Sequence, residues 1–143
     1  MTQKSISESD KIAIQEAIRR AEELTSGEIR VHIDQNCKGN PLERAIQVFN
    51  KLKMQATKER NGVLIYLSFK DKKLAILGDI GIDEKVGSDF WTSTKDQLIL
   101  DFKNNQFREG ITNAVIEVGK RLKEYFPHQA DDSDELSNEI TFD

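Results

Sequence analysis

The chain has 143 residues, of which 37% are hydrophobic and 32% charged, the size and composition of one soluble globular domain. Its formal net charge of −4 argues mildly against nucleic acid as the main partner, because binding to phosphates needs a concentrated lysine and arginine surface. Cys37 is the only cysteine, which excludes an intramolecular disulfide and a zinc site built on cysteines.

The amino-terminal segment has no apolar stretch of signal-peptide length, and nowhere do 18 apolar residues follow one another. We therefore expect a cytoplasmic monomer with no membrane span and no nucleic-acid partner. The two histidines, His32 and His128, are too few for a histidine-rich zinc or iron centre.

Apolar periodicity predicts a first helix that is capped by Ser7 or Ser9 and ended by Gly27 as a left-handed C-terminal cap. Residues 28–34 (EIRVHID) alternate apolar and polar side chains, which predicts a half-buried strand. Pro41 then opens a second helix. The apolar face predicted for that helix consists of Leu42, Ala45, Ile46, Phe49 and Leu52.

Residues 62–69 (GVLIYLSF) are a continuous apolar run, typical of a central strand that is covered on both faces. The polar turn KDKK leads into residues 74–79 (LAILGD), and the two strands are predicted to form an antiparallel hairpin. Two helices are predicted after the hairpin, at residues 88–104 and 107–126, and Pro127 ends the second one.

Helices before, between and after the strands can cover both faces of one sheet, so the order of elements predicts an α/β fold. The expected architecture is a three-layer α/β/α sandwich with a small mixed sheet. Residues 1–127 are expected to form this single domain. Residues 128–143 form an acidic tail with few large apolar groups, and we expect this tail to be disordered.

The common catalytic motifs are absent, since the chain has no P-loop, no GxSxG elbow and no GxGxxG after a strand. Cys37 lies in a loop without an evident orienting partner, so we expect a solvent-facing thiol and not a nucleophile. His32 is on the polar side of its strand and is expected to be an ordinary surface histidine. His128 begins the tail, where no role is expected.

Residues 75–91 (AILGDIGIDEKVGSDFW) place four carboxylates on a glycine-punctuated turn, namely Asp79, Asp83, Glu84 and Asp89, and the three aspartates are the candidate ligands. Clustered carboxylates are ligands that Ca²⁺ and Mg²⁺ prefer, and glycines let such side chains converge. Glu28 starts another strand, and strand pairing could bring it alongside. The structural alternative makes Asp79 a turn residue, Asp83 a helix cap and Asp89 a first-turn residue that compensates the helix dipole.

Arg60 directly precedes the central strand and could hold a phosphate or a carboxylate through two hydrogen bonds. Alternatively, Asn61 and Gly62 form a turn while Arg60 pairs with an acidic neighbour. Phe90 and Trp91 open an amphipathic helix and are expected in the core.

Residues 60–91 (RNGVLIYLSFKDKKLAILGDIGIDEKVGSDFW), followed by 107–127 (FREGITNAVIEVGKRLKEYFP), resemble the TPM-domain family. That family includes a thylakoid-lumen protein of photosystem II repair and many bacterial proteins. The similarity covers roughly residues 5–127. It implies an α/β/α sandwich and, in some members, a divalent-cation site near the G-x-G turn. Carried onto this chain, the site falls on Asp79 and Asp83, with Asp89 and Glu28 as neighbours.

Three functions are compatible with these residues. The first is binding of Ca²⁺ or Mg²⁺ at the acidic turn, with an unassigned cellular role. The second is a metal-assisted phosphatase acting on phosphomonoesters, an activity that has been attributed to a plant member of the family. In this second hypothesis the cation polarises the phosphoryl group, and Arg60 of this chain stabilises the phosphoryl oxygens. The third is a protein-interaction module with an unidentified partner. We place cation binding first, because the sequence offers no nucleophile or general base beyond the same carboxylates.

Overall fold

A four-stranded mixed sheet forms the centre of the protein. The computed structural model describes residues 6–87, 89–128 and 140–142. The strand order is β3-β2-β1-β4, with β1 parallel to both β2 and β4, and β2 antiparallel to β3. The strands are β1 (Glu28–Asp34), β2 (Gly62–Ser68), β3 (Lys73–Gly78) and β4 (Thr141–Phe142). The predicted hairpin and the predicted mixed sheet are therefore confirmed.

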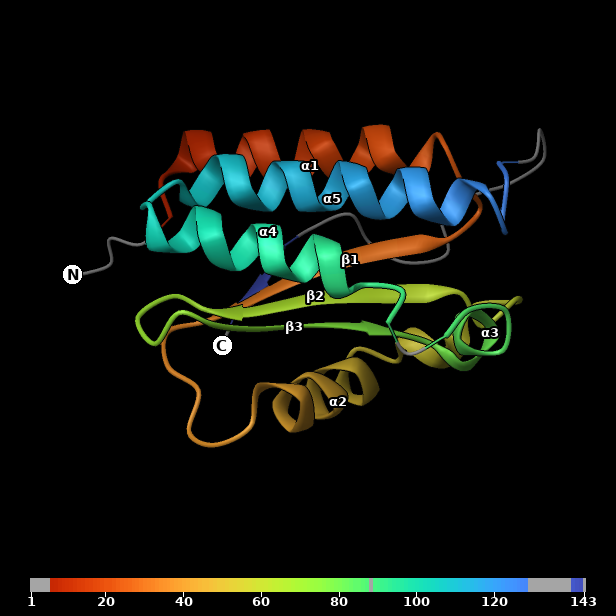
Figure 1. Ribbon diagram of the computed structural model, residues 1–143, viewed down its shortest axis with the longest axis horizontal. Coiled ribbons are helices and arrows are strands. Elements are labelled where there is room, and N and C mark those ends of the chain that lie inside the picture. The colour runs from red at the N-terminus through yellow and green to blue at the C-terminus, as the bar shows by residue number, and fades with distance from the viewer. Residues whose placement is uncertain (1–5, 88, 129–139, 143) are drawn as a thin grey trace.

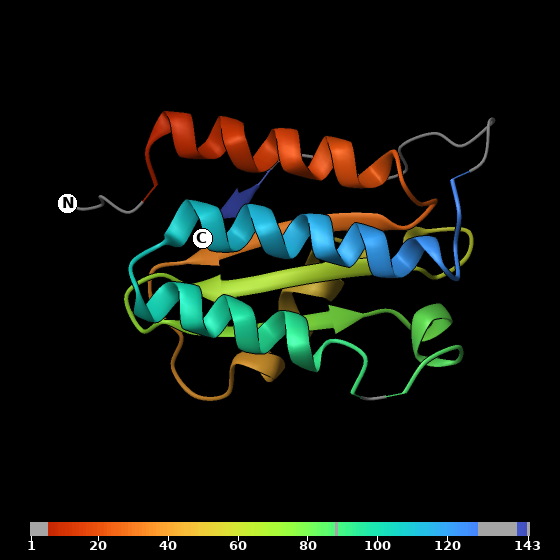
Figure 2. The same ribbon diagram turned by 45° about the horizontal axis from the view of Figure 1, so that its top comes forward.

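Helices cover both faces of the sheet, as Figures 1 and 2 show. One face carries α1 (Glu8–Glu22), α4 (Thr92–Lys103) and α5 (Phe107–Lys123). The other face carries α2 (Pro41–Lys51). A short 3₁₀ helix, η1 (Met54–Ala56), precedes β2, and a single turn, α3 (Ile80–Asp83), follows β3. The predicted α/β/α sandwich is confirmed. Within the described residues, no helix is both long and apolar enough to cross a membrane.

The first helix begins as predicted and ends differently. Ser7 caps α1 in a capping box, accepting from the backbone N–H of Asp10 while the Asp10 carboxylate accepts from that of Ser7. The predicted left-handed cap at Gly27 is wrong, because α1 ends at Glu22 and Gly27 does not have a positive φ. A Cβ atom on Gly27 would lie 2.8 Å from Cδ1 of Leu122, so close packing against α5 favours glycine there.

The second helix starts at Pro41, and the Asn40 side chain caps it by accepting from two backbone N–H groups. Its predicted apolar face is partly wrong, since Leu42 and Ile46 are 46% and 44% exposed. The residues of α2 that are buried against β2 and β3 are Ala45, Val48 and Phe49.

Two hydrophobic clusters separate the layers. The larger one lies between the sheet and α1, α4 and α5, and it includes Trp91 with Phe90 packed against it, as predicted. The smaller one lies between the sheet and α2, where Tyr66, Leu64 and Met54 are fully buried. The side chains of β1 that face away from the larger cluster are polar.

The half-buried strand predicted at residues 28–34 is wrong, because all seven residues of β1 are buried. Its four polar side chains are between 3% and 8% exposed, namely Glu28, Arg30, His32 and Asp34. At His32 and Ile33 the outer edge of β1 is covered from the other end of the chain, because β4 pairs with it there. The expectation of a disordered tail is thus wrong for β4, whereas residues 129–139 and 143 lie outside the described residues.

Candidate functional site

The acidic turn, defined as residues 79–83, joins the end of β3 to α3. Asp79 is the N-cap of α3, and its side chain accepts from the backbone N–H of Ile80 at 2.7 Å. The residue is only 6% exposed. The structural alternative predicted Asp83 as a helix cap, and this is wrong. Asp79 caps α3, and Asp83 is the last residue of that helix.

Arg60 holds the Asp79 carboxylate from the neighbouring strand. Its Nε lies 2.8 Å from Oδ2 of Asp79, and its Nη2 lies 2.9 Å from Oδ1. This two-point geometry is the strongest form of arginine–carboxylate pairing. The hydrogen bond to Asp79 also raises the pKa of Arg60. Two roles were predicted for Arg60, binding of an external phosphate or carboxylate and pairing with an acidic neighbour. The structure shows the pairing.

Gly81 fixes the position of the turn against the backbone before β2. Its N–H donates to the carbonyl of Arg60 at 2.9 Å. A Cβ atom on Gly81 would lie 2.2 Å from the carbonyl oxygen of Glu59 and 2.6 Å from that of Arg60. Arg60 itself has a φ of 52°, in the left-handed region. The turn is thus packed tightly against the segment before β2, and only glycine fits at position 81.

Asp83 brings a second carboxylate to the same turn. Burial of its carboxyl group and, next, the negative charge of Asp79 raise the pKa of Asp83, although the residue as a whole is exposed. The two acids therefore repel each other even though Arg60 pairs with Asp79, and a cation placed between both carboxylates would relieve that repulsion.

The other two predicted ligands are placed differently. Glu28 pairs with Gly62 in the sheet, and the backbone N–H of Asp79 bonds to the Gly62 carbonyl from the other side, so β2 lies between the two acids. Met54 packs over Gly62, with its carbonyl oxygen 3.2 Å from where a Cβ atom would be. Asp89 is exposed, between α3 and α4. Within the described residues, no group of three or more His, Cys, Asp or Glu side chains could hold a metal ion. The four-carboxylate ligand set therefore stays a prediction.

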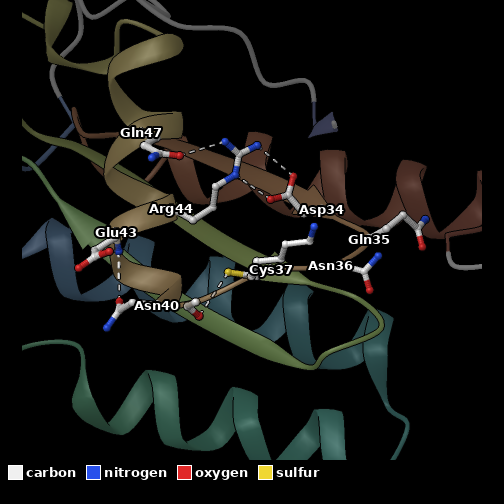
Figure 3. A pocket seen from close by; sticks show the side chains of 10 residues that line it. Asp34, Gln35, Asn36, Cys37, Asn40, Glu43, Arg44 and Gln47 are labelled. Carbon is white, nitrogen blue, oxygen red and sulfur yellow. Dashed lines mark hydrogen bonds and ion pairs between the residues drawn. The ribbon is translucent and has the colours of Figure 1, made fainter.

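A second site, not predicted from the sequence, lies at the opposite end of β1. A pocket of about 450 Å³ opens there between the β1–α2 loop and the first turns of α2 (Figure 3). We call it the β1 pocket. Its lining residues are Asp34, Gln35, Asn36, Cys37, Lys38, Gly39, Asn40, Glu43, Arg44 and Gln47.

The carboxylate of Asp34 is the centre of a hydrogen-bond network behind this pocket. Its Oδ2 accepts from Nε of Arg44 at 2.9 Å and from the hydroxyl of Tyr66 at 2.6 Å, and its Oδ1 lies 2.8 Å from Nε2 of His32. Burial acts to raise the pKa of Asp34, but the hydrogen bonds from Arg44, Tyr66 and His32 together lower it below its ordinary value.

His32 connects this network to the carboxyl-terminal strand. Because the ionised Asp34 can only accept, Nε2 of His32 carries a proton. Its Nδ1 lies 2.7 Å from the hydroxyl oxygen of Thr141 in β4. The surface position expected for His32 is wrong, since the residue is 3% exposed. The sequence signal was the spacing of His32 and Asp34, which places both side chains on one face of a strand.

Cys37 also differs from expectation, because it is 4% exposed and not solvent-facing. Its backbone N–H donates to the Asp71 carboxylate at 2.8 Å. Nζ of Lys73 donates to the carbonyls of Cys37 and Gly39, both at 2.9 Å. The β2–β3 hairpin thus anchors the loop that forms the rim of the pocket.

Comparisons with known proteins agree on a family and a fold. The family model of the TPM domain, named TPM phosphatase, matches residues 2–129. The solution structure of the BA42 protein from the psychrophilic bacterium Bizionia argentinensis is 41% identical, with a TM-score of 0.93, and the match covers 100% of this chain and 99% of that one. A comparison with curated proteins gives no match.

Two more distant structures share the fold. The amino-terminal domain of a protein from P. gingivalis is 15% identical, with a TM-score of 0.67, and the match covers 88% of this chain and 83% of that one. The amino-terminal domain of the cg2496 protein from Corynebacterium glutamicum is also 15% identical, with a TM-score of 0.60, and the match covers 92% and 81% of the two chains.

Proposed function

This chain belongs to the TPM domain family, and from that premise we propose that it binds a divalent cation, Ca²⁺ or Mg²⁺, at the acidic turn. Asp79 and Asp83 are the ligands in this proposal, and water completes the coordination. Mg²⁺ in particular is commonly held by one or two carboxylates and several waters, and Ca²⁺ also accepts carboxylates and water.

The observation that carries the proposal is the placement of Asp79 and Asp83 at the two ends of the single turn α3, where the backbone N–H of Asp83 donates to the carbonyl of Asp79 at 3.1 Å. The charge of Asp79 contributes to the raised pKa of Asp83. A cation bound between the two carboxylates would remove that repulsion and favour the ionised form of both. The tight packing of Gly81 against the backbone of Glu59 and Arg60 fixes the turn, so little ordering is needed on binding.

When no metal ion is bound, the guanidinium of Arg60 is the positive charge that pairs with the Asp79 carboxylate. Nearly half of the Arg60 side chain is exposed, whereas only 5% of the Asp79 side chain is. The guanidinium can therefore move into solvent while the carboxylate stays in place. In this proposal the cation and the guanidinium compete for Asp79.

Thermal unfolding in the presence and absence of Ca²⁺ and Mg²⁺ tests the proposal, because a ligand that binds the folded state raises the Tm. We expect a rise for the natural protein and none for Asp79→Asn or Asp83→Asn. Asp96→Asn, at an exposed position of α4, changes the net charge by the same amount and is expected to keep the rise. A rise that persists in Asp83→Asn and in Asp79→Asn would refute the site.

A second candidate function is metal-assisted hydrolysis of phosphomonoesters. The observation in its favour is the exposed guanidinium of Arg60 beside the two carboxylates, within a family whose model is named for a phosphatase. The cation would polarise the phosphoryl group and activate water, and Arg60 would stabilise the phosphoryl oxygens. Turnover of an aryl phosphate should then require Asp79, Asp83 and Arg60. Turnover that is equal in all three variants would come from a contaminant.

A further inference from the structure

The β1 pocket is lined mainly by residues that carry polar groups. Apart from Cys37 and Gly39, all of its lining residues have charged or carboxamide side chains. Most pockets for drug-like ligands are lined mainly by apolar and aromatic side chains, whereas this one has no aromatic lining residue. Its volume of about 450 Å³ is nevertheless that of a small-molecule site.

The charges in the pocket balance one another. Two acids, Asp34 and Glu43, face two bases, Lys38 and Arg44. The central pair is closed within the protein, with Nε of Arg44 at 2.9 Å from Oδ2 of Asp34. An anion or a cation would find no excess of opposite charge, so the lining fits a ligand without net charge.

Four carboxamides complete the lining, at Gln35, Asn36, Asn40 and Gln47. Asn40 uses its oxygen to cap α2, and Gln47 accepts from Nη1 of Arg44 at 3.4 Å. Asn40 and Gln47 each also carry an NH₂ group, which can donate. Hydroxyl groups both donate and accept, so a polyhydroxylated ligand can bond to the amide and the carboxylate side chains that Figure 3 shows around the pocket.

We propose that the β1 pocket binds an uncharged polyhydroxylated molecule, such as a monosaccharide or a cyclic polyol. The Asp34 network and the Lys73 contacts hold the lining in place before binding, which lowers the cost of ordering it. The site lies at the carboxyl end of β1, the end at which open α/β sheets usually bind ligands. It is independent of the acidic turn, which lies at the other end of the sheet.

Amide NMR shifts test the proposal in the presence of a chelator, so that the cation site is empty. The titrants are glucose, galactose, mannose and myo-inositol at millimolar concentrations, with glycine and inorganic phosphate as zwitterionic and anionic probes. We expect at least one hydroxylated titrant to produce saturable shifts at residues 35–47. No saturable shift with any of the four, or saturable shifts there with glycine or phosphate alone, would overturn the proposal.

Two variants locate the binding. Gln47→Ala removes one exposed donor of the pocket and should weaken binding about threefold to tenfold, the loss expected for one neutral hydrogen bond. Gln97→Ala, on α4 at the opposite face of the sheet, is the matched control and should leave the affinity unchanged. Equal affinities for the natural protein and Gln47→Ala, or an equal loss in both variants, would contradict binding in the β1 pocket.

Discussion

The guanidinium of Arg60 binds the carboxylate of Asp79 through two parallel hydrogen bonds, Nε to Oδ2 at 2.8 Å and Nη2 to Oδ1 at 2.9 Å. The two residues are 19 positions apart and lie just outside β2 and β3. Antiparallel pairing of the strands brings the start of one beside the end of the other. The ion pair therefore closes the open end of the hairpin and sets the charge of the acidic turn.

Replacing Arg60 should strengthen cation binding. In Arg60→Gln the guanidinium no longer competes for Asp79, and we expect the Kd for Ca²⁺ or Mg²⁺ to fall about fivefold or more, a typical coupling between linked sites. Isothermal titration calorimetry measures this change. Arg108→Gln, which removes an exposed arginine near Asp10 and Glu109, serves as the control. Weaker binding by Arg60→Gln would mean that Arg60 supports the cation site and does not compete with the ion.

Removing the second charge of the acidic turn should stabilise the protein at neutral pH. Because the pKa of Asp83 is raised on folding, stability falls as the pH rises through the folded value, and the penalty is fully present above it. Asp83→Asn does not titrate, so we expect it to be more stable than the natural protein at pH 7 by about a few tenths of a kcal/mol, as for other exposed charges.

Urea unfolding in the absence of divalent cations measures this gain at pH 7 and again near pH 3. The gain should vanish near pH 3, because Asp83 is then mostly protonated in both the folded and the unfolded protein. A variant that is less stable than the natural protein at pH 7 would contradict the unfavourable charge.

A methyl group at Gly81 should disrupt the turn. In Gly81→Ala the new Cβ atom overlaps the carbonyl oxygens of Glu59 and Arg60, and we expect a loss of about 1–3 kcal/mol of unfolding free energy from overpacking. Gly87→Ala is the matched control, since nothing lies within 4 Å of its Cβ position, and it should change stability by less than about 0.5 kcal/mol. Urea unfolding compares the two, and equal effects would contradict the close contact.

The hydroxyl of Tyr66 should stabilise the ionised Asp34. Tyr66 is fully buried and donates to Oδ2 of Asp34 at 2.6 Å, so Tyr66→Phe should cost about 1.5–3 kcal/mol at pH 7, the range for a hydrogen bond to a charged group. Tyr125→Phe, at a residue that is 38% exposed, is the control and should cost much less.

The cost of Tyr66→Phe should depend on pH with a defined sign. Because the pKa of Asp34 is lowered on folding, its contribution to stability is present above the ordinary value and is lost as the pH falls through the folded value. The variant lacks one donor, so it should lose this contribution at a higher pH than the natural protein. Unfolding free energies measured from pH 7 down to pH 2 check this, and a cost that stays constant over that range would count against the role of Tyr66.

Local sequence patterns were sufficient for most of the secondary structure. The cap Ser7 and the first helical residue Pro41 act within one helical turn, and the apolar run of β2 needs no distant partner to be recognised as a buried strand. The family resemblance and the sandwich follow from these same segments. At the acidic turn, Asp79 and Arg60 were both named as candidates from the sequence, and their roles as ligands stay predictions, whereas their pairing with each other was left open.

Long-range pairing decided what sequence patterns could not show. The alternation in β1 is that of a strand with one exposed face, and His32 was expected there as a surface residue. Its burial depends on β4, about 109 positions away, and on the partners that Asp34 finds on α2 and β2. Similarly, the need for glycine at position 27 comes from Leu122 on α5 and not from a local cap.

The sequence by itself thus determined the elements, the α/β/α class and the family, because capping, periodicity and turn chemistry act between residues close along the chain. Only the tertiary structure decided that Arg60 neutralises Asp79 and that the polar face of β1 is buried behind a pocket. Both features join side chains from separate elements, and their contact depends on strand register and helix placement, which no local pattern encodes.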